Sequence, residues 1–178
     1  MSDKNAPIER AVGDDNSRAM GIDLTGSQDQ LLQGVAQFIA AQQLAVVATR
    51  GPDGAPQAAL VGIAITDRFE LVFDSVQSSR KVLNIRRDSR VAVVVGGTMQ
   101  DERTVQVDGV ADEPTGDEGE RVREAYFRRW PDGRERQSWA GITYVRITPQ
   151  WLRFSDWTVS PAVVAEWVRG EELLQRRA

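Results

Sequence analysis

A cluster of hydroxyl and cationic side chains follows a short apolar segment near the middle of the chain. Ser75, Ser78 and Ser79 precede two adjacent cations, Arg80 and Lys81, at the predicted start of a helix. Hydroxyl groups, the free N–H groups of a first helical turn and positive charges are the groups that bind a phosphate in proteins. The cluster therefore predicts a phosphate site. A strand-to-helix connection with solvated cations and an ordinary Ser cap has the same composition and stays as the alternative interpretation.

The chain contains no Cys and no His. Disulfides, thiolate chemistry and a Ser-His-Asp triad are therefore excluded, and the commonest metal ligand is missing. The acidic residues at the predicted strand ends show no metal-ligand spacing, and we expect no metal site; they are Asp67, Asp101, Glu102, Asp112 and Glu113. An enzyme of this composition would take its reactivity from a cofactor.

The totals predict an ordinary globular protein. With 178 residues and a hydrophobic share of 41%, the chain is long enough for one domain with a real core. A net charge of -4 argues against general nucleic-acid binding. The apolar stretch over residues 58–65 is too short to span a bilayer. Because the N-terminal residues are also polar, we expect a cytoplasmic protein without a membrane partner.

Periodicity divides the chain into three parts. Residues 1–26 are rich in Asp, Asn, Gly and Ser, and they predict a flexible N-terminal arm. Residues 27–160 are expected to form the main domain, with Ser27 as a helix N-cap at its start. Residues 161–178 are expected to form a C-terminal helix packed on that domain. Helices are predicted over residues 27–43, 79–87, 117–130 and 161–175.

Segments of β-branched and apolar residues, separated by Gly, Pro and Asp turns, predict an antiparallel sheet. The predicted strands are residues 44–50, 57–65, 69–74, 90–96, 102–112, 142–147 and 151–157. We expect residues 90–96, nearly all Val and Ala, to be buried on both faces. Residues 131–140 are predicted to form a loop, and residues 148–150 a hairpin turn. The fold class that follows is α+β, mainly β: a small antiparallel barrel with helices packed outside.

The order of several short motifs resembles one known family. Residues 46–56 read as an Ala-Thr strand followed by a Gly-x-Pro-like hairpin, and Ser79-Arg80-Lys81 precedes a strand that begins with Arg90-Val91. This order is similar to that of the pyridoxamine 5'-phosphate oxidase family and its wider superfamily of FMN-binding split β-barrels. The agreement is best over residues 44–95, and it continues more weakly through residues 102–111 and 145–152.

The resemblance implies a homodimer of split β-barrels with FMN bound in the groove between the subunits. Arg80 and Lys81 would bind the FMN phosphate, and Asp74 and Ser75 would line the edge of the flavin. By position in the family pattern, the other cofactor residues would be Ser79, Thr104, Ala59, Leu60 and Val61. A small-molecule substrate and NAD(P)H as hydride donor would complete an oxidoreductase, while Tyr126 and Tyr144 are the acid–base candidates in the absence of His and Cys.

Two departures separate the chain from the pyridoxamine phosphate oxidases themselves. Those enzymes carry further basic residues on the second strand, whereas residues 57–62 contain no cation, and their His-containing motif near the C-terminus is missing. The chain is more similar to the reductases and stress-related proteins of the family, some of which bind a deazaflavin coenzyme. The alternatives are therefore a deazaflavin-dependent reductase and a flavin-binding protein without catalytic turnover.

Aromatic residues in the C-terminal half have two interpretations each. Trp130 and Trp139, among the cations of residues 128–136, could cover a flavin from the partner subunit, but core anchors on a solvated helix are the favoured reading. The cations are Arg128, Arg129, Arg134 and Arg136. Trp151, Phe154 and Trp157 could form a wall of the flavin site, although a barrel core or a dimer interface is favoured.

Overall fold

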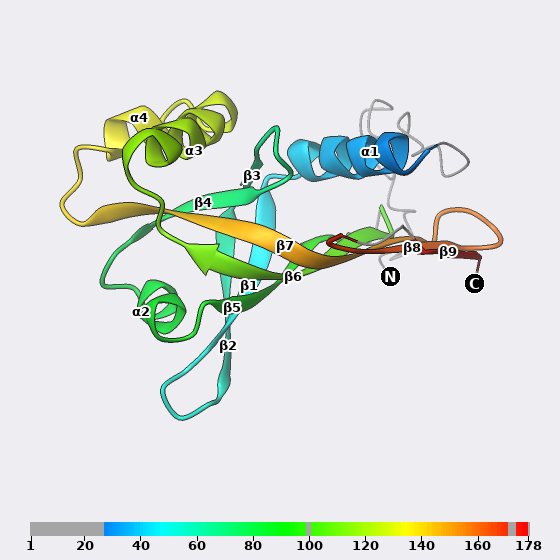
Figure 1. Ribbon diagram of the computed structural model, residues 1–178, viewed down its shortest axis with the longest axis horizontal. Helices are drawn as coiled ribbons and strands as arrows, with labels where there is room; N and C mark the ends of the chain where they lie inside the picture. The colour runs from blue at the N-terminus through cyan, green and yellow to red at the C-terminus, as the bar shows by residue number, and fades with distance from the viewer. Residues whose placement is uncertain (1–26, 99–100, 171–173, 178) are drawn as a thin grey trace, which may run out of the picture.

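The computed structural model describes residues 27–98, 101–170 and 174–177 (Figure 1). The predicted arm over residues 1–26 lies outside the described residues. The strands are β1 (Leu44–Arg50), β2 (Pro56–Gly62), β3 (Ala64–Ile65), β4 (Leu71–Val76), β5 (Arg90–Gly96), β6 (Arg103–Asp112), β7 (Ile142–Asp156), β8 (Val163–Val168) and β9 (Leu174–Arg177). The helices are α1 (Gln28–Ala41), α2 (Arg80–Arg87), α3 (Gly116–Arg129) and the short α4 (Gly133–Arg136).

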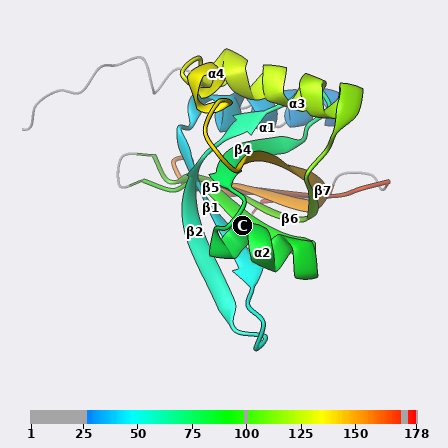
Figure 2. The same cartoon turned by 90° about the vertical axis from the view of Figure 1, so that its left-hand side faces the viewer.

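Within the described residues, nine strands form one sheet in the order β2-β1-β5-β6-β7-β4-β3; off this path, β8 pairs with β7, and β9 pairs with β8. Every pair is antiparallel, as the sequence predicts. The sheet curls into a split β-barrel with the helices outside, which confirms the predicted fold class. Figure 2 shows α2 beside the β1–β2 hairpin, at the opposite end of the curled sheet from α1, α3 and α4, and both α1 and α2 contribute to the main core. No helix in the described part has the length and apolar character to cross a membrane.

Helix α1 begins where the sequence predicts, at a reciprocal cap. The Ser27 hydroxyl accepts from the Gln30 backbone N–H, and the Gln30 side chain accepts from the Ser27 backbone N–H at 2.7 Å. These contacts satisfy donors that a helix N-terminus otherwise leaves free. The apolar face of α1 then places Val35, Phe38 and Ile39 in the main core inside the curl.

A second, smaller core lies under α3, on the outer side of the sheet. Val122, Tyr126 and Phe127 from α3 pack there against Val72 and Tyr144. Ring centroids of Phe127 and Tyr144 are 5.6 Å apart in an edge-to-face arrangement, the geometry that aromatic quadrupoles favour. This packing holds α3 on β7 and on β4, the strand that leads to α2.

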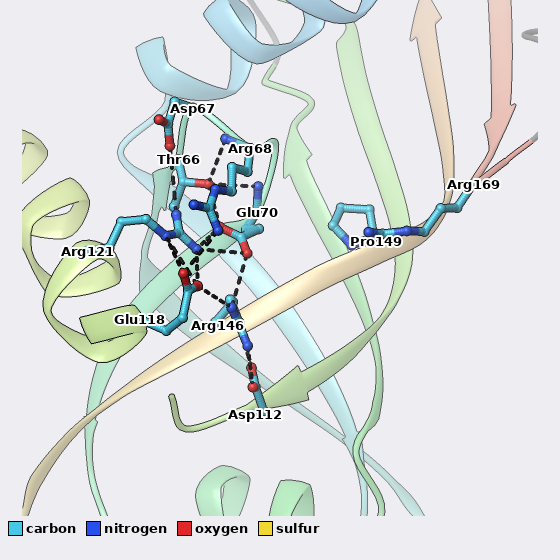
Figure 3. A network of polar contacts seen from close by, with 10 residues as sticks. All are labelled: Thr66, Asp67, Arg68, Glu70, Asp112, Glu118, Arg121, Arg146, Pro149 and Arg169. Atoms are coloured by element: carbon cyan, nitrogen blue, oxygen red, sulfur yellow. Dashed lines mark hydrogen bonds and ion pairs between the residues drawn. The ribbon is translucent and has the colours of Figure 1, made fainter. Parts of the chain in front are cut away.

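Buried ion pairs also hold α3 against β7 and against the residue that precedes β4 (Figure 3). Glu70 is 7% exposed and accepts from Arg121 of α3 at 2.8 Å and from Arg146 of β7 at 3.2 Å. Glu70 also accepts from the Thr66 hydroxyl at 2.8 Å. Glu118 joins both arginines, at 2.8 Å from Arg121 and 3.1 Å from Arg146. A charge buried at this depth is tolerated because cations and hydrogen bonds surround it.

The predicted hairpin over residues 148–150 is wrong, because β7 is one strand of fifteen residues. The turn-like residues instead sit at a β-bulge, where Trp151 pairs with Asp108 and Pro149 pairs with Gly109, leaving Gln150 as the extra residue. A bulge accommodates a Pro, which has no ladder N–H to donate. Gly109 is required there, since a Cβ would lie 2.7 Å from the Thr148 carbonyl oxygen.

The predicted C-terminal helix over residues 161–178 is also wrong: β8 and β9 form there instead. Strand β4 covers only residues 142–147 of β7, so the edge of residues 151–156 is left without a partner on that side. Strand β8 pairs with this edge, and its β-branched residues suit a pleated strand better than a helix. Pairing with the open edge of β7, which is a long-range interaction, therefore makes this segment a strand and not a helix.

Three smaller predictions also need correction. The predicted strand over residues 57–65 is interrupted at Ile63, whose backbone N–H donates to the carbonyl of Gln43. Strand β5 is buried on one face only, because Ala92 and Val94 are exposed. Part of the segment predicted as a loop over residues 131–140 forms the single turn of α4.

Candidate functional site

The N-terminus of α2 is open toward a cavity. Ser79 takes the N-cap position with extended backbone angles, but its side chain makes no cap hydrogen bond. Its hydroxyl lies instead 3.0 Å from the hydroxyl of Ser75 at the end of β4. The first backbone N–H groups of a helix have no intrahelical acceptor. The first backbone N–H groups of α2 are therefore available to donate hydrogen bonds to a ligand.

The cavity at this helix end, called the α2 cavity below, has a volume of about 420 Å³. Its lining comes from the last turn before α2, the first turn of α2 and the facing parts of β1 and β2. The lining residues are Thr49, Gln57, Ala58, Ala59, Ser79, Arg80 and Lys81. The predicted phosphate cluster and one wall of the predicted flavin site thus meet in one place.

Arg80 and Lys81 are not neutralised by the protein. Among the described residues, neither cation makes an ion pair or a side-chain hydrogen bond, whereas Arg86, later in the same helix, is held by Glu113 at 2.7 Å. Two free cations beside the positive end of a helix dipole form a local positive field in a chain whose net charge is -4. The α2 cavity is therefore suited to an anion.

A buried amide joins α2 to the β1–β2 hairpin beside the cavity. Asn84 is 2% exposed, and its Nδ2 donates to Thr49 Oγ1 at 3.0 Å and to Gln57 Oε1 at 2.9 Å. Asn84 belongs to the motif that suggested the family, yet the sequence did not mark it or Gln57 and Thr49 as site residues. The available signal was a polar residue at a position of α2 that helical spacing turns toward the core, one turn after Arg80 and Lys81.

Asp74 does not line the α2 cavity. It lies on the other face of β4 from Ser75, and its carboxylate accepts from Arg136 of α4 at 2.7 Å. Arg136 also donates to the Tyr126 hydroxyl at 3.3 Å and pairs with Asp132. Burial, and then the neighbouring Asp74 carboxylate, raises the pKa of Tyr126 far above its usual range. A phenol of that kind stays protonated near neutral pH, so it is a poor general base.

The other predicted cofactor residues are divided between faces. Ala59 lines the α2 cavity, but Leu60 points to the outer face of the sheet with 63% exposure and Val61 is buried in the main core. Thr104 pairs with Gly96 at the far end of β5, near α1. The structure therefore brings Ser79, Arg80, Lys81 and Ala59 together at the α2 cavity within one chain. Ser75 does not line this cavity, but its hydroxyl contacts that of Ser79.

The aromatic candidates separate in the same way. Trp130 is partly buried, donates from Nε1 to the carbonyl of Ile63 at 3.0 Å and packs on the second core, so it is an anchor. Phe154 lies fully in the main core. Trp139 and Trp157 are exposed at 59% and 53%. Neither of them contributes to the packing of this chain in the way that Trp130 does.

A further hollow of about 470 Å³ lies between the start of β7 and α3. It mixes charges: Arg123 faces it, and so does Glu113, which is bound to Arg86 and accepts from Thr143 at 2.7 Å. The Arg86 contact lowers the pKa of Glu113, so this carboxylate stays ionised and paired. No residue of the predicted cofactor site lines this hollow.

Comparison with known sequences gives one family. A sequence model of the pyridoxamine 5'-phosphate oxidase family matches residues 31–156 of the chain. The match runs from α1 to the end of β7, so it includes the whole of the α2 cavity. No curated protein matches the chain.

Solved structures show the same fold. A pyridoxamine 5'-phosphate oxidase-related, FMN-binding protein from Nostoc punctiforme has a TM-score of 0.63 at 12% identity, over 82% of this chain and 95% of that one. A conserved hypothetical protein from Mycobacterium tuberculosis is 28% identical, with a TM-score of 0.59 over 70% of this chain and 83% of that one. A heme binding protein from Mycobacterium smegmatis has a TM-score of 0.64 at 18% identity; 75% of this chain matches only 56% of that one. The chain thus spans little more than half the length of the heme binding protein.

Proposed function

Because the chain belongs to the pyridoxamine 5'-phosphate oxidase family, we propose that it is an FMN-binding oxidoreductase that acts as a homodimer on a small-molecule substrate. The observation that carries the proposal is the α2 cavity, where two cations without protein partners meet the open N-terminus of a helix. A phosphate monoester matches this set of donors. Arg80 supplies a planar fork and Lys81 a point charge, and Ser79 adds a hydroxyl.

The rest of the cavity suits the ring system that follows such a phosphate. Ala59 presents a small apolar side chain on the cavity face of β2, and Ala58 beside it in the lining is also small, so β2 leaves room for a flat aromatic group. When bound, FMN would supply the hydride-transfer chemistry that a chain without His and Cys lacks. The protein's own contribution would be to bind and orient the cofactor and to admit the substrate and a hydride donor such as NAD(P)H.

The outer face of the sheet supports the homodimer. Strands β2, β1 and β5 lie side by side there and expose apolar side chains in register, with Val46 opposite both Leu60 and Val94. Strand β6 adds Val110 beside β5, and the large exposed members of this outer apolar face are Leu44, Val46, Leu60, Val94 and Val110. An exposed apolar surface of this kind marks an interaction site, and a self-complementary patch leads to a symmetric dimer. Thr104, remote from the cavity of its own chain, would reach a cofactor only through such a partner.

Heme is the competing ligand that the structural neighbours raise. Iron in heme proteins is bound mostly by His, Cys or Met, and less often by Tyr. This chain has no His or Cys, and no Met stands among the described residues. Its two tyrosines are buried, with Tyr126 bonded to Arg136 and Tyr144 donating to the Gly133 carbonyl at 3.2 Å. The donor set therefore favours the phosphate of a flavin over heme iron.

The experiment is to purify the protein, record its absorption spectrum and identify the released chromophore by mass. The stripped protein is then titrated with FMN, riboflavin and heme. We expect FMN to bind at least tenfold more tightly than riboflavin, because only FMN carries the phosphate. Equal affinity for FMN and riboflavin, or heme as the released chromophore, contradicts the proposal. A released deazaflavin would support the deazaflavin-dependent alternative, and FMN without turnover in a reductase assay would support a binding protein.

A further inference from the structure

Lysine is nearly absent from this chain. Of its 22 cationic residues, 20 are Arg and two are Lys, at Lys4 and Lys81. Lys4 lies outside the described residues, so Lys81 is the one Lys in the part of the chain that the structure describes, and it lines the α2 cavity. The ion pairs that hold the fold together, such as those of Arg121 and Arg136, are made by Arg. An amine side chain is therefore placed at the cavity and is not used for packing.

An amine and a guanidinium differ in the reactions that they allow. An Arg guanidinium stays protonated and binds carboxylates in a fixed fork, whereas a Lys amine can lose its proton and attack a carbonyl carbon. Nothing in the lining of the α2 cavity occupies the amine of Lys81, because that lining contains no acidic residue. Lys81 is thus a nucleophile that the protein leaves open to the contents of the cavity.

The groups beside Lys81 select the molecules that would reach it. Arg80 and the first backbone N–H groups of α2 suit a phosphate. A molecule bound there by its phosphate shares a space of about 420 Å³ with the Lys81 amine. Confining two reactive groups together raises the rate at which they form a bond. The carbonyl compound that this arrangement favours is a small aldehyde that also carries a phosphate.

No other nucleophile in the cavity competes for such an aldehyde. The chain has neither Cys nor His. The hydroxyls of the lining belong to Thr49 and Ser79, which contact Asn84 Nδ2 and the Ser75 hydroxyl, each at 3.0 Å. The side chains that remain on β2 are an amide and two methyl groups. The amine of Lys81 is therefore the reactive group of this site.

We propose that Lys81 is a covalent modification site for small phosphorylated aldehydes, which bind by their phosphate at Arg80 and the N-terminus of α2 and form an imine with the Lys81 amine. Lys81 Nζ bonds to the aldehyde carbon, and the carbonyl oxygen leaves as water with the two hydrogens of the neutral amine, so no oxidant or reductant is needed. The proposal rests on the proposed function, since it uses the same phosphate site. Because the adduct fills that site, it would exclude FMN and make cofactor loading sensitive to the aldehyde.

The test treats the stripped full-length protein with glyceraldehyde 3-phosphate or with glyceraldehyde, traps imines with cyanoborohydride and locates the adduct by peptide mass. At Lys81 we expect the phosphorylated aldehyde to react at least about tenfold faster, because only this aldehyde is captured by its phosphate. Lys4 is the internal control and should react at similar rates with both aldehydes. Saturating FMN should suppress the adduct on Lys81 and leave that on Lys4 unchanged.

Two variants separate capture of the phosphate from reaction of the amine. Lys81→Arg keeps the positive charge and removes the amine, so the peptide that contains it should carry no adduct. Arg80→Ala keeps the amine and removes the fork that binds phosphate, so glyceraldehyde 3-phosphate should lose most of its advantage over glyceraldehyde. Arg128→Ala, at an exposed position of α3, is the matched control and should react as the wild type does. Melting temperatures establish that each variant folds, and protection by FMN decides the assignment if Arg80→Ala does not fold.

The outcomes distinguish this inference from the proposed function. Equal rates of the two aldehydes at Lys81, or equal labelling of Lys4 and Lys81 by the phosphorylated aldehyde, would overturn the inference. If the wild type then still binds FMN more tightly than riboflavin, the proposed function stands. A phosphate-dependent adduct on Lys81, in a protein that does not distinguish FMN from riboflavin, would support the inference and contradict the proposed function.

Discussion

The hydroxyl of Ser79 lies 3.0 Å from that of Ser75, and this contact keeps the N-terminus of α2 uncapped by its own N-cap residue. A Ser at this position normally accepts from a backbone N–H of the first turn. Here the hydroxyl is turned to the end of β4, so the backbone donors of α2 remain available beside Arg80 and Lys81. The same loop thus connects the sheet to the helix and shapes the anion site.

Replacing either free cation should weaken FMN binding without disturbing the fold. For Arg80→Ala or Lys81→Ala we expect a loss of about 1.5–3 kcal/mol, which is roughly ten- to 150-fold in Kd, because each removes a charge-assisted contact to the phosphate. Riboflavin affinity should stay unchanged. Isothermal titration with both flavins measures the effect. Arg128→Ala, at an exposed cation of α3, is the control and should behave as the wild type; equal losses for FMN and riboflavin would refute a phosphate contact.

Asp74 should contribute more to stability than to cofactor binding. Its carboxylate is paired with Arg136 at 2.7 Å, and both side chains are less than one-fifth exposed. Asp74→Asn keeps the shape and removes the charge, which should destabilise the protein by about 1–2 kcal/mol in chemical denaturation. FMN affinity should change less than in Arg80→Ala. A loss of FMN affinity as large as that of Arg80→Ala, with stability unchanged, would place Asp74 at the flavin after all.

The part of the site that the sequence predicts is the part made from neighbours in the chain. Ser79, Arg80 and Lys81 are consecutive, so their convergence needs only a helix start. Gln57 and Asn84 meet although they are 27 residues apart, and nothing in either local pattern predicts that contact. Strand alternation places Asp74 on the opposite face of β4 from Ser75, whereas the family pattern groups the two residues at the flavin.

The fold shows the same division. Alternation and turn residues predict the strands up to β6, because each has its own local signal. Whether residues 148–150 form a turn or a strand depends on β6, where Gly109 allows the bulge that keeps β7 continuous. Residues 163–168 form a strand and not a helix because they pair with the open edge of β7. Local pattern cannot report a partner strand that lies elsewhere in the sequence.

Acid should weaken the attachment of α3 through Glu118. A hydrogen bond from Arg121 lowers the pKa of Glu118 from its ordinary value of 4.5 to about 2. The unfolded chain therefore binds a proton at this group at a higher pH than the folded chain does. The contribution of Glu118 to stability is complete above pH 4.5 and should be lost as the pH falls toward 2. Urea unfolding midpoints measured across this range should fall less steeply for Glu118→Gln than for the wild type.

The control for this titration is Glu120→Gln, at an exposed position on the same helix that makes no ion pair with the described residues. It should keep the acid dependence of the wild type. If Glu118→Gln and Glu120→Gln show the same slope as the wild type, the contacts to Arg121 and Arg146 do not contribute to acid stability.

A charge on the outer apolar face should break the proposed dimer and the cofactor site together. Leu60 is the most exposed of the large apolar residues on this face and stands opposite Val46 of β1. Leu60→Asp would place a carboxylate in the interface of both subunits, where burying an unpaired charge is costly. Light scattering should then show a mass of 19.7 kDa in place of twice that value. Because the groove for FMN is proposed to need both subunits, affinity for FMN should fall when the dimer is lost, while the circular dichroism spectrum stays that of a folded chain.

Glu102→Gln, at an exposed site outside this face, is the control and should remain dimeric. A wild type that is monomeric at micromolar concentration and still binds FMN tightly would show that the site is complete within one chain.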